Sequence, residues 1–249
     1  MRRFFVPTSQ IQNSRAAISG DEFHHLRHVL RLQVGDRVTL RDDHGKEHYG
    51  TIATLSPSAA EVIISRSEQL STSRLHLTLA LGLLKGQKMD LVIEKVTELG
   101  VGRIAPFTSM FTVSQLSTER QGDRLLRWHR VAQSAAKQSG SNMPDILAPQ
   151  TFSQLCASLS SDTPILLLYE HERAATLKAF AADHPQISSL CVIVGPEGGF
   201  AAEEIEQARR AEVAVLGLGL QVLRAETASL VAVALCRFLW DDGAVPPLP

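Results

Sequence analysis

The chain has 249 residues and a mass of 27.2 kDa, which allows one large domain or two small ones. Hydrophobic residues make up 44% and charged residues 20%, a composition that excludes disorder along the whole chain. The formal net charge of −1 excludes a generally basic nucleic-acid-binding protein, so affinity for nucleic acid would need a local patch. The three cysteines are far apart and predict no disulfide framework, and no apolar run is as long as a membrane span. We therefore expect a cytoplasmic protein.

The first 70 residues predict short strands around one helix. The spacing of Ser19 and Glu22 is typical of a capping box, which predicts a helix over residues 20–31. Alternating segments separated by turn residues follow at positions 38–40, 48–55 and 61–64. This pattern indicates a small β-barrel.

A polar stretch over residues 68–73 separates this part from a longer second part. The predicted strands of the second part lie at residues 75–84, 103–107, 164–169, 190–194 and 213–216. The predicted helices lie at residues 85–100, 119–140, 201–211 and 227–239. Such an alternation of strands and helices favours an α/β domain with a parallel sheet. We therefore place two domains at residues 1–70 and 74–249.

A glycine-rich turn, GPEGGF at residues 195–200, follows one predicted strand and leads into a helix. Gly195, Gly198 and Gly199 then lie at the carboxyl end of that strand, where open α/β sheets bind ligands. The spacing matches neither G-x-G-x-x-G nor a P-loop, and Glu197 would repel a pyrophosphate. A ligand with a positive centre fits better. The alternative is that the glycines only permit a tight turn.

A second loop, VLGLGLQVLRAETA at residues 215–228, also follows a predicted strand. Two glycines and an apolar hook precede Arg224 and Glu226, and Thr227 is a natural N-cap for the next helix. Backbone groups exposed between apolar side chains could bind an adenine. The alternative is a structural loop in which Arg224 pairs with Glu226 or Glu197.

These motifs occur in a fixed order with several others. The matching stretches are RFFV at 3–6, HHLRHVLR at 24–31, VGD at 34–36, KVTELGV at 95–101 with Pro106, GPEGGF at 195–200, LG at 218–219 and LRAETA at 223–228, with looser matches at Gln138, Ser139 and Pro144. Together they resemble the ribosomal RNA small subunit methyltransferase E family of the SPOUT class. Each motif alone is weak, but their order over nearly the whole chain is specific.

The resemblance implies a fold, a reaction and a cofactor site. The implied α/β fold has a small PUA-like β-barrel domain for RNA, followed by a SPOUT-type, trefoil-knotted parallel-sheet domain. The implied reaction is methyl transfer from S-adenosyl-L-methionine to N3 of one uridine in the 16S rRNA of the small ribosomal subunit, by a homodimer. The implied cofactor pocket is built from the end of residues 166–170, the turn at residues 195–199 and the loop at residues 216–223. The implied cofactor-binding residues are Leu168, Tyr169, Gly195, Pro196, Glu197, Gly198, Gly199, Leu216, Leu218, Gly219, Val222 and Leu223.

Such a reaction needs a cation and a base beside the cofactor. Uridine N3 holds its proton at neutral pH, so this proton has to leave and the developing anion has to be stabilised. Arg224 is our candidate cation, and Glu226 or Glu197 could accept the proton or position Arg224; we take Arg224 and Glu226 as the catalytic pair. N3 lies on the Watson–Crick edge, so the uridine must be unpaired or flipped out. We expect Gly198→Val to abolish cofactor binding, and Arg224→Ala to spare binding but lose turnover.

A basic patch in the first domain indicates phosphate contacts. Residues 1–41 hold seven arginines and three acidic residues. The candidate RNA-binding residues are Arg2, Arg3, His24, Arg27, Arg31 and Lys88. The alternative for them is a solvated helix face. His24 and His28 have no evident third ligand, so we expect no metal site.

The sequence departs from the family pattern in three places, and two arginines expected near the RNA are missing as a result. Leu220 and Gln221 stand where Pro and Arg are usual, residues 108–113 read TSMFTV without the usual Arg, and residues 138–141 read QSGS instead of QSGR. The competing interpretations are a SPOUT enzyme with another product, such as ribose 2′-O-methylation, and a non-catalytic ribosome-binding factor. A third is an enzyme that binds nucleotide phosphate at the glycine turn, which Glu197 opposes.

Overall fold

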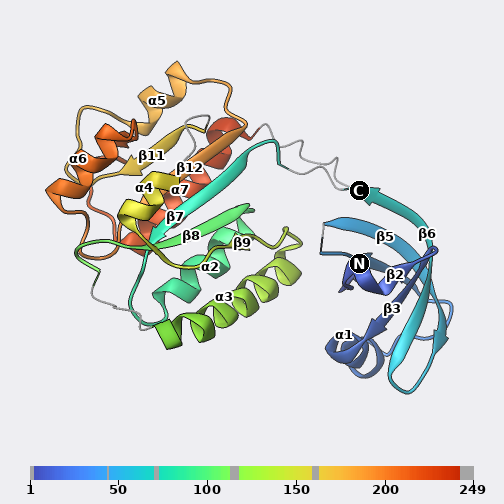
Figure 1. Cartoon of the computed structure of the whole chain (residues 1–249). Helices are drawn as coiled ribbons and strands as arrows, with labels where there is room; N and C mark the ends of the chain where they lie inside the picture. The colour runs from blue at the N-terminus through green and yellow to red at the C-terminus, as the bar shows by residue number, and fades with distance from the viewer. Residues whose placement is uncertain (1–2, 44, 70–72, 113–117, 159–162, 242–249) are drawn as a thin grey trace. The chain divides into compact units, whose positions relative to one another are not determined.

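The structure is a computed structural model that describes residues 3–43, 45–69, 73–112, 118–158 and 163–241 (Figure 1). The chain divides into two compact units, Met1–Thr72 and Ser73–Pro249. Each unit has its own buried apolar core. The two units are therefore described separately.

Six strands form the sheet of the first unit, in the order β1-β4-β5-β6-β3-β2. They are β1 (Arg3–Phe5), β2 (Ile11–Gln12), β3 (Arg15–Ser19), β4 (Arg37–Arg41), β5 (Lys46–Leu55) and β6 (Ala59–Gln69). All neighbouring pairs are antiparallel except β1 with β4. The long strands β5 and β6 are strongly curved (Figure 1). The core of this unit includes Phe4, Leu26, Leu40 and Val62, all of them buried.

The predicted helix over residues 20–31 is shorter and less regular than expected. It consists of α1 (Gly20–His24) and a π-helical turn, η2 (His25–Val29), in which Leu30 N donates to His25 O at 3.0 Å. Arg31 then adopts a positive φ of 52°, which ends the helix. The predicted capping box is wrong, because the Ser19 hydroxyl caps no helix N–H and instead accepts a bond from Gln10 Nε2 at 3.4 Å.

The second unit is built on a parallel sheet in the order β10-β8-β7-β12-β11-β13, with β9 beside β8. The strands are β7 (His76–Gly82), β8 (Arg103–Thr108), β9 (Asp145–Ile146), β10 (Gln150–Thr151), β11 (Ile165–Leu168), β12 (Ser189–Val194) and β13 (Ala214–Leu216). The helices are α2 (Lys88–Glu98), α3 (Thr118–Ser139), α4 (Phe152–Ser158), α5 (Leu177–Asp183), α6 (Ala202–Arg210) and α7 (Ala225–Trp240). They cover both faces of the sheet (Figure 1).

Alternate side chains of each central strand serve opposite faces of this sheet. In β12, Leu190 and Val192 belong to the apolar cluster under α2, α3, α5 and α7. Cys191 and Ile193 of the same strand belong to the cluster under α4 and α6. Burial on both faces explains why the strands appear in the sequence as continuous apolar runs.

The long predicted helices and strands of this unit are present, with shifted ends. Helix α2 begins at Lys88 rather than at residue 85, and α7 begins at Ala225, so Arg224 rather than Thr227 occupies its N-cap position. Sequence reasoning missed β9, β10, α4 and α5, which are too short to produce a clear period. Among the described residues, no helix combines the length and the apolar character needed to cross a membrane.

Candidate active site

A cavity of about 340 Å³ lies at the carboxyl ends of β11, β12 and β13. This is the edge at which open parallel sheets bind their ligands. Apart from Lys88, its walls come from the segments after these three strands and from the start of α7. The lining residues are Lys88, Leu168, Tyr169, Glu170, Val194, Gly195, Pro196, Glu197, Gly199, Phe200, Leu218, Gly219, Gln221, Val222, Leu223, Arg224, Ala225 and Ala228.

The glycine turn after β12 is held close to its neighbours. A Cβ at Gly195 would lie 2.8 Å from the ring of Phe200, and a Cβ at Gly199 would lie 2.8 Å from Glu170 Oε1. Gly199 also has a positive φ of 70°, which favours glycine. Phe200 packs against the rings of Phe107 and Phe152 in the buried cluster below. The turn is therefore fixed by aromatic packing while its glycines leave the cavity open.

The loop after β13 presents apolar side chains and free backbone groups to the cavity. Leu218, Val222 and Leu223 line it. Within the described part of the chain, the backbone N–H groups of residues 218–223 donate no hydrogen bond. Gly217 N donates to Ala175 O at 2.9 Å, which anchors the start of the loop. Unpaired amides beside apolar side chains are what a flat heteroaromatic ring such as adenine requires.

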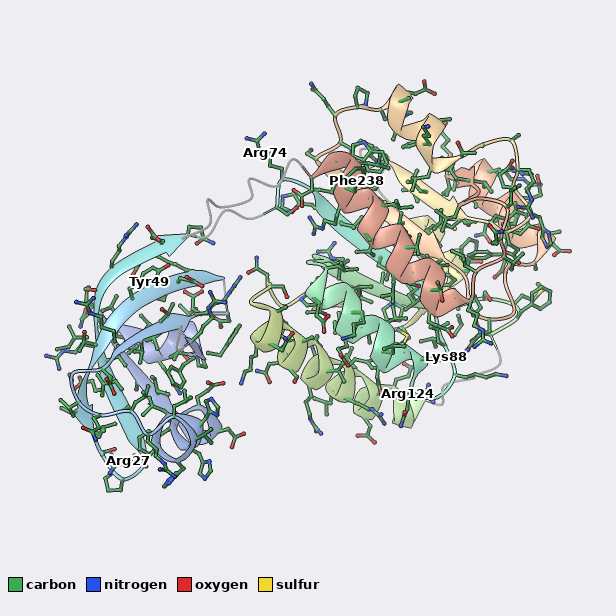
Figure 2. The ribbon with its side chains drawn as sticks, turned by 180° about the vertical axis from the view of Figure 1, so that it is seen from behind. Arg27, Tyr49, Arg74, Lys88, Arg124 and Phe238 are labelled. Atoms are coloured by element: carbon green, nitrogen blue, oxygen red, sulfur yellow. The ribbon has the colours of Figure 1, made fainter. Side chains whose placement is uncertain are left out.

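Lys88 bridges two carboxylates at the wall of the cavity. Its Nζ lies 3.2 Å from Glu197 Oε1 and 3.4 Å from Glu226 Oε2. The Lys85 backbone N–H donates to the same Glu197 oxygen at 3.2 Å. Figure 2 shows Lys88 close to the N-terminal end of α7, which carries Glu226. Residues from α2, the glycine turn and α7 thus meet in one ion-pair network.

This network changes the acidity of its members. Burial alone raises the pKa of Glu197, but bonds from its own backbone N–H and from Lys85 N, together with Lys88, outweigh burial and hold the pKa below its usual value. The hydrogen bond to Glu197, with help from Glu226, raises the pKa of Lys88, so the ammonium stays charged at neutral pH. Glu226 Oε2 is buried, and its contact with Lys88 is a long one of 3.4 Å.

The structure separates the two predicted catalytic residues. Arg224 is exposed and lines the cavity, and its guanidinium makes no hydrogen bond or ion pair within the described ranges. The expected alternative, a pair between Arg224 and Glu226 or Glu197, is therefore wrong, because Lys88 occupies both carboxylates. Glu226 does not line the cavity. It contacts Lys88, which does line it.

Most of the predicted cofactor-binding residues line the cavity, and two do not. Leu216 is buried in the core at the end of β13. Gly198 points away, since a Cβ there would lie 2.8 Å from Phe111 Cβ. Glu170 ends the segment 166–170, from which the pocket was expected to take one wall, and it lines the cavity. The lining residues that sequence reasoning missed are Lys88, assigned instead to RNA, and Val194, Phe200, Ala225 and Ala228.

The predicted RNA-binding residues lie in different surroundings. Arg3 NH2 pairs with Glu47 Oε1 at 2.8 Å, whereas His24, Arg27 and Arg31 are exposed on or after α1 and η2. Figure 2 shows Arg27 on the surface of the first unit. Arg2 falls outside the described residues. In the part of the chain that the structure describes, no group of three or more His, Cys, Asp or Glu side chains is placed to hold a metal ion.

Comparison with known proteins adds the family. Residues 71–237 match the family model of the RNA methyltransferase domain, and residues 18–65 match that of the RNA methyltransferase PUA domain. The "Ribosomal RNA small subunit methyltransferase E" of Bacillus subtilis is 30% identical, with 96% of each chain covered. The chain belongs to the ribosomal RNA small subunit methyltransferase E family. Its fold is accordingly a PUA-like domain followed by a SPOUT-type methyltransferase domain.

Solved structures agree with this family. The ribosomal RNA small subunit methyltransferase E of Neisseria gonorrhoeae, bound to S-adenosyl methionine, is 30% identical with a TM-score of 0.84, covering 98% of this chain and 99% of that one. A methyltransferase of Legionella pneumophila, also in complex with this cofactor, is 27% identical with a TM-score of 0.81, covering 96% and 98%. Both of these proteins were solved with the same cofactor bound.

Proposed function

We propose that the protein transfers a methyl group from S-adenosyl-L-methionine to N3 of a specific uridine in the 16S rRNA of the small ribosomal subunit. The cavity at the carboxyl ends of β11, β12 and β13 carries this proposal. It combines free backbone amides, apolar side chains and the carboxylates of Glu170 and Glu197. This is the donor set for a ligand that has an adenine at one end and a sulfonium at the other.

The residues of the cavity divide between the two parts of such a cofactor. The amides of residues 218–223 and the side chains of Leu218, Val222 and Leu223 would hold the adenine. Lys88 neutralises Glu197, but Glu170 places in the wall a carboxylate that pairs with no lysine or arginine within the described residues, and this carboxylate would attract a cationic sulfonium. When bound, the cofactor supplies an electrophilic methyl group.

Three side chains would serve the uridine. Arg224, whose guanidinium has no partner within the described residues, would stabilise the negative charge that develops on the base as N3 loses its proton. Glu226 would accept that proton by way of Lys88, which lines the cavity and whose Nζ lies 3.4 Å from Glu226 Oε2. Lys88 would hold Glu226 and Glu197 in place. The bond from N3 to the methyl carbon forms as the sulfonium becomes a neutral thioether, so charge balances.

We also propose a role for each of the two domains, a cellular location and an oligomeric state. Residues 1–70 would bind RNA through the exposed His24, Arg27 and Arg31, and residues 74–249 would carry the reaction, in the cytoplasm. A homodimer is supported by apolar side chains that α7 exposes: Phe238 is 84% exposed, with Leu235 and Leu239 beside it on the same helix (Figure 2). Exposed apolar side chains of this kind are typical of a protein–protein interface, here with a second copy of the chain.

The test is an assay with small ribosomal subunits that lack the modification. The protein is incubated with them and with cofactor carrying a labelled methyl group, and the digested RNA is analysed by mass spectrometry. Labelled 3-methyluridine, lost in Arg224→Ala while calorimetry still detects cofactor binding, supports the proposal. A labelled ribose would identify a 2′-O-methyltransferase. Cofactor binding without any labelled nucleoside would favour a binding factor.

A further inference from the structure

The segment that follows β8 exposes two large apolar side chains. Met110 is 66% exposed and Phe111 is 48% exposed. Soluble proteins bury most side chains of this kind, so two adjacent ones on a loop suggest a contact surface. None of the roles proposed above involves this segment, and its sequence contains no arginine.

This segment is tightly anchored. Met110 N donates to Glu204 Oε1 at 2.9 Å, and Glu204, on α6, is only 7% exposed. Ser109 N donates to Thr112 Oγ1 at 2.7 Å, which closes a local turn. The backbone is therefore fixed by hydrogen bonds while the side chains of Met110 and Phe111 remain at the surface. A fixed backbone lowers the entropy cost of a contact made by those side chains.

The same segment touches the glycine turn of the candidate cofactor cavity. A Cβ at Gly198 would lie 2.8 Å from Phe111 Cβ and 2.9 Å from its carbonyl oxygen. Met110, Phe111, Thr112 and Gly198 line a shallow hollow. The neighbours of Gly198 in the turn, Glu197 and Gly199, line the cofactor cavity itself. The apolar surface therefore packs against the turn whose other residues form part of the wall of the proposed reaction site.

We propose that Phe111, with Met110 beside it, is a stacking platform for the unpaired pyrimidine base on which the enzyme acts. This inference rests on the proposed function, because methylation at N3 requires a base removed from its pairing partner. A base extruded in this way loses its stacking neighbours, and proteins replace them with aromatic side chains. The platform holds the base by its face, which leaves the N3 edge free for the chemistry.

The test compares Phe111→Ala with Phe111→Tyr. Stacking of one base is worth roughly 1–3 kcal/mol, so Phe111→Ala should lower kcat/KM for small subunits roughly 5- to 150-fold. Phe111→Tyr should stay within about threefold of the parent protein, because it keeps the aromatic face. Cofactor affinity by calorimetry and the salt dependence of subunit binding should not change, since no charge is removed. Leu126→Ala, which trims an exposed side chain on α3, is the matched control.

Three results would overturn the platform: unchanged kcat/KM in Phe111→Ala, no rescue by tyrosine, or an altered oligomeric state in light scattering, which would make Phe111 part of a protein interface. Failure of the proposed function is recognised separately, because the parent protein then forms no 3-methyluridine. In that case the binding of small subunits to Phe111→Ala and to the parent protein, measured by sedimentation, tests whether Phe111 contacts the RNA. Equal binding by Phe111→Ala and the parent protein would reject the platform.

Discussion

Lys88 Nζ, at the first residue of α2, lies 3.4 Å from Glu226 Oε2 in the first turn of α7. Glu197 completes the network from the glycine turn. A single ammonium group therefore connects two helices and the turn that shapes the cavity. This arrangement places Lys88 in the wall of the cavity, whereas its sequence position predicted an RNA contact.

Lys88→Met should lower turnover at least about tenfold, because both carboxylates lose the group that positions them. The acid limb of the rate profile should move to higher pH, since Lys88 helps to lower the pKa of Glu197. Cofactor affinity should not weaken, because the cavity becomes more negative towards a cationic ligand. Lys95→Met, which removes a lysine paired with Glu94 and Glu98 on the same helix, is the control. Unchanged turnover with a shallower salt dependence of subunit binding would return Lys88 to an RNA-binding role.

Glu197 should make stability depend on pH in the acid range. Its folded-state pKa lies below the ordinary value, so its contribution is present above the unfolded pKa and is lost as pH falls through the folded one. As the pH falls from about 5 to about 3, the Tm of the parent protein should decrease more than the Tm of Glu197→Gln. Thermal unfolding followed by circular dichroism measures both. Glu212→Gln, an exposed carboxylate of the same unit, should lose as much as the parent; an equal loss in Glu197→Gln would contradict the prediction.

Gly199→Ala should weaken cofactor binding about tenfold or more, because the new Cβ would lie 2.8 Å from Glu170 Oε1, in the cavity wall. The positive φ of 70° adds a backbone cost of about 1–2 kcal/mol to folding. Gly86→Ala is the matched control, since Gly86 has a φ of 59° and nothing within 4 Å of the added Cβ. It should share the lower Tm but keep the calorimetric affinity. Equal affinity losses in both variants would mean that backbone strain, and not Glu170, explains the effect.

Gly198→Ala should impair the use of the RNA substrate without impairing cofactor binding. Its Cβ faces Phe111 and not the cofactor cavity, so cofactor affinity should stay within about threefold while methylation of small subunits falls at least about fivefold. Gly102→Ala is the control, because its Cβ would make only an ordinary 3.5 Å contact with Leu77 O. Loss of cofactor binding in Gly198→Ala would instead support the role that we expected from the motif alone.

The long elements of the second unit could be predicted because their periods are clear. Strand β12 is an unbroken apolar run, and α7 is rich in Ala, Leu and Val. The short elements α4 and α5, of seven residues each, bury only Phe152, Leu155 and Leu177 and give no comparable signal. The end of the first helix also escaped prediction, since the π-helical turn after His24 depends on how Phe23 and Leu26 fit the core.

The loops that form the cavity could be predicted from the sequence, but the contacts between its side chains could not. Both loops that form it follow predicted parallel strands and carry glycines, so their meeting at one edge follows from the fold. The ion pairs of Lys88 join residues that are distant in the chain, and no spacing rule connects them. Glu170 and Phe200 end predicted segments, but their close approaches to Gly199 and Gly195 appear only in three dimensions.

Glu204 accepts one bond from Met110 N and another from Ala201 N, each at 2.9 Å, so a single buried carboxylate holds both the Phe111 segment and the residue that follows the glycine turn. A displacement on either side would therefore strain a hydrogen bond of the carboxylate that also holds the other side. If cofactor binding shifts the turn, the affinity for the RNA base changes by some factor, and thermodynamic reciprocity requires that RNA change the cofactor affinity by the same factor. The two substrates would then bind with positive or negative cooperativity, and Glu204 would be its physical basis.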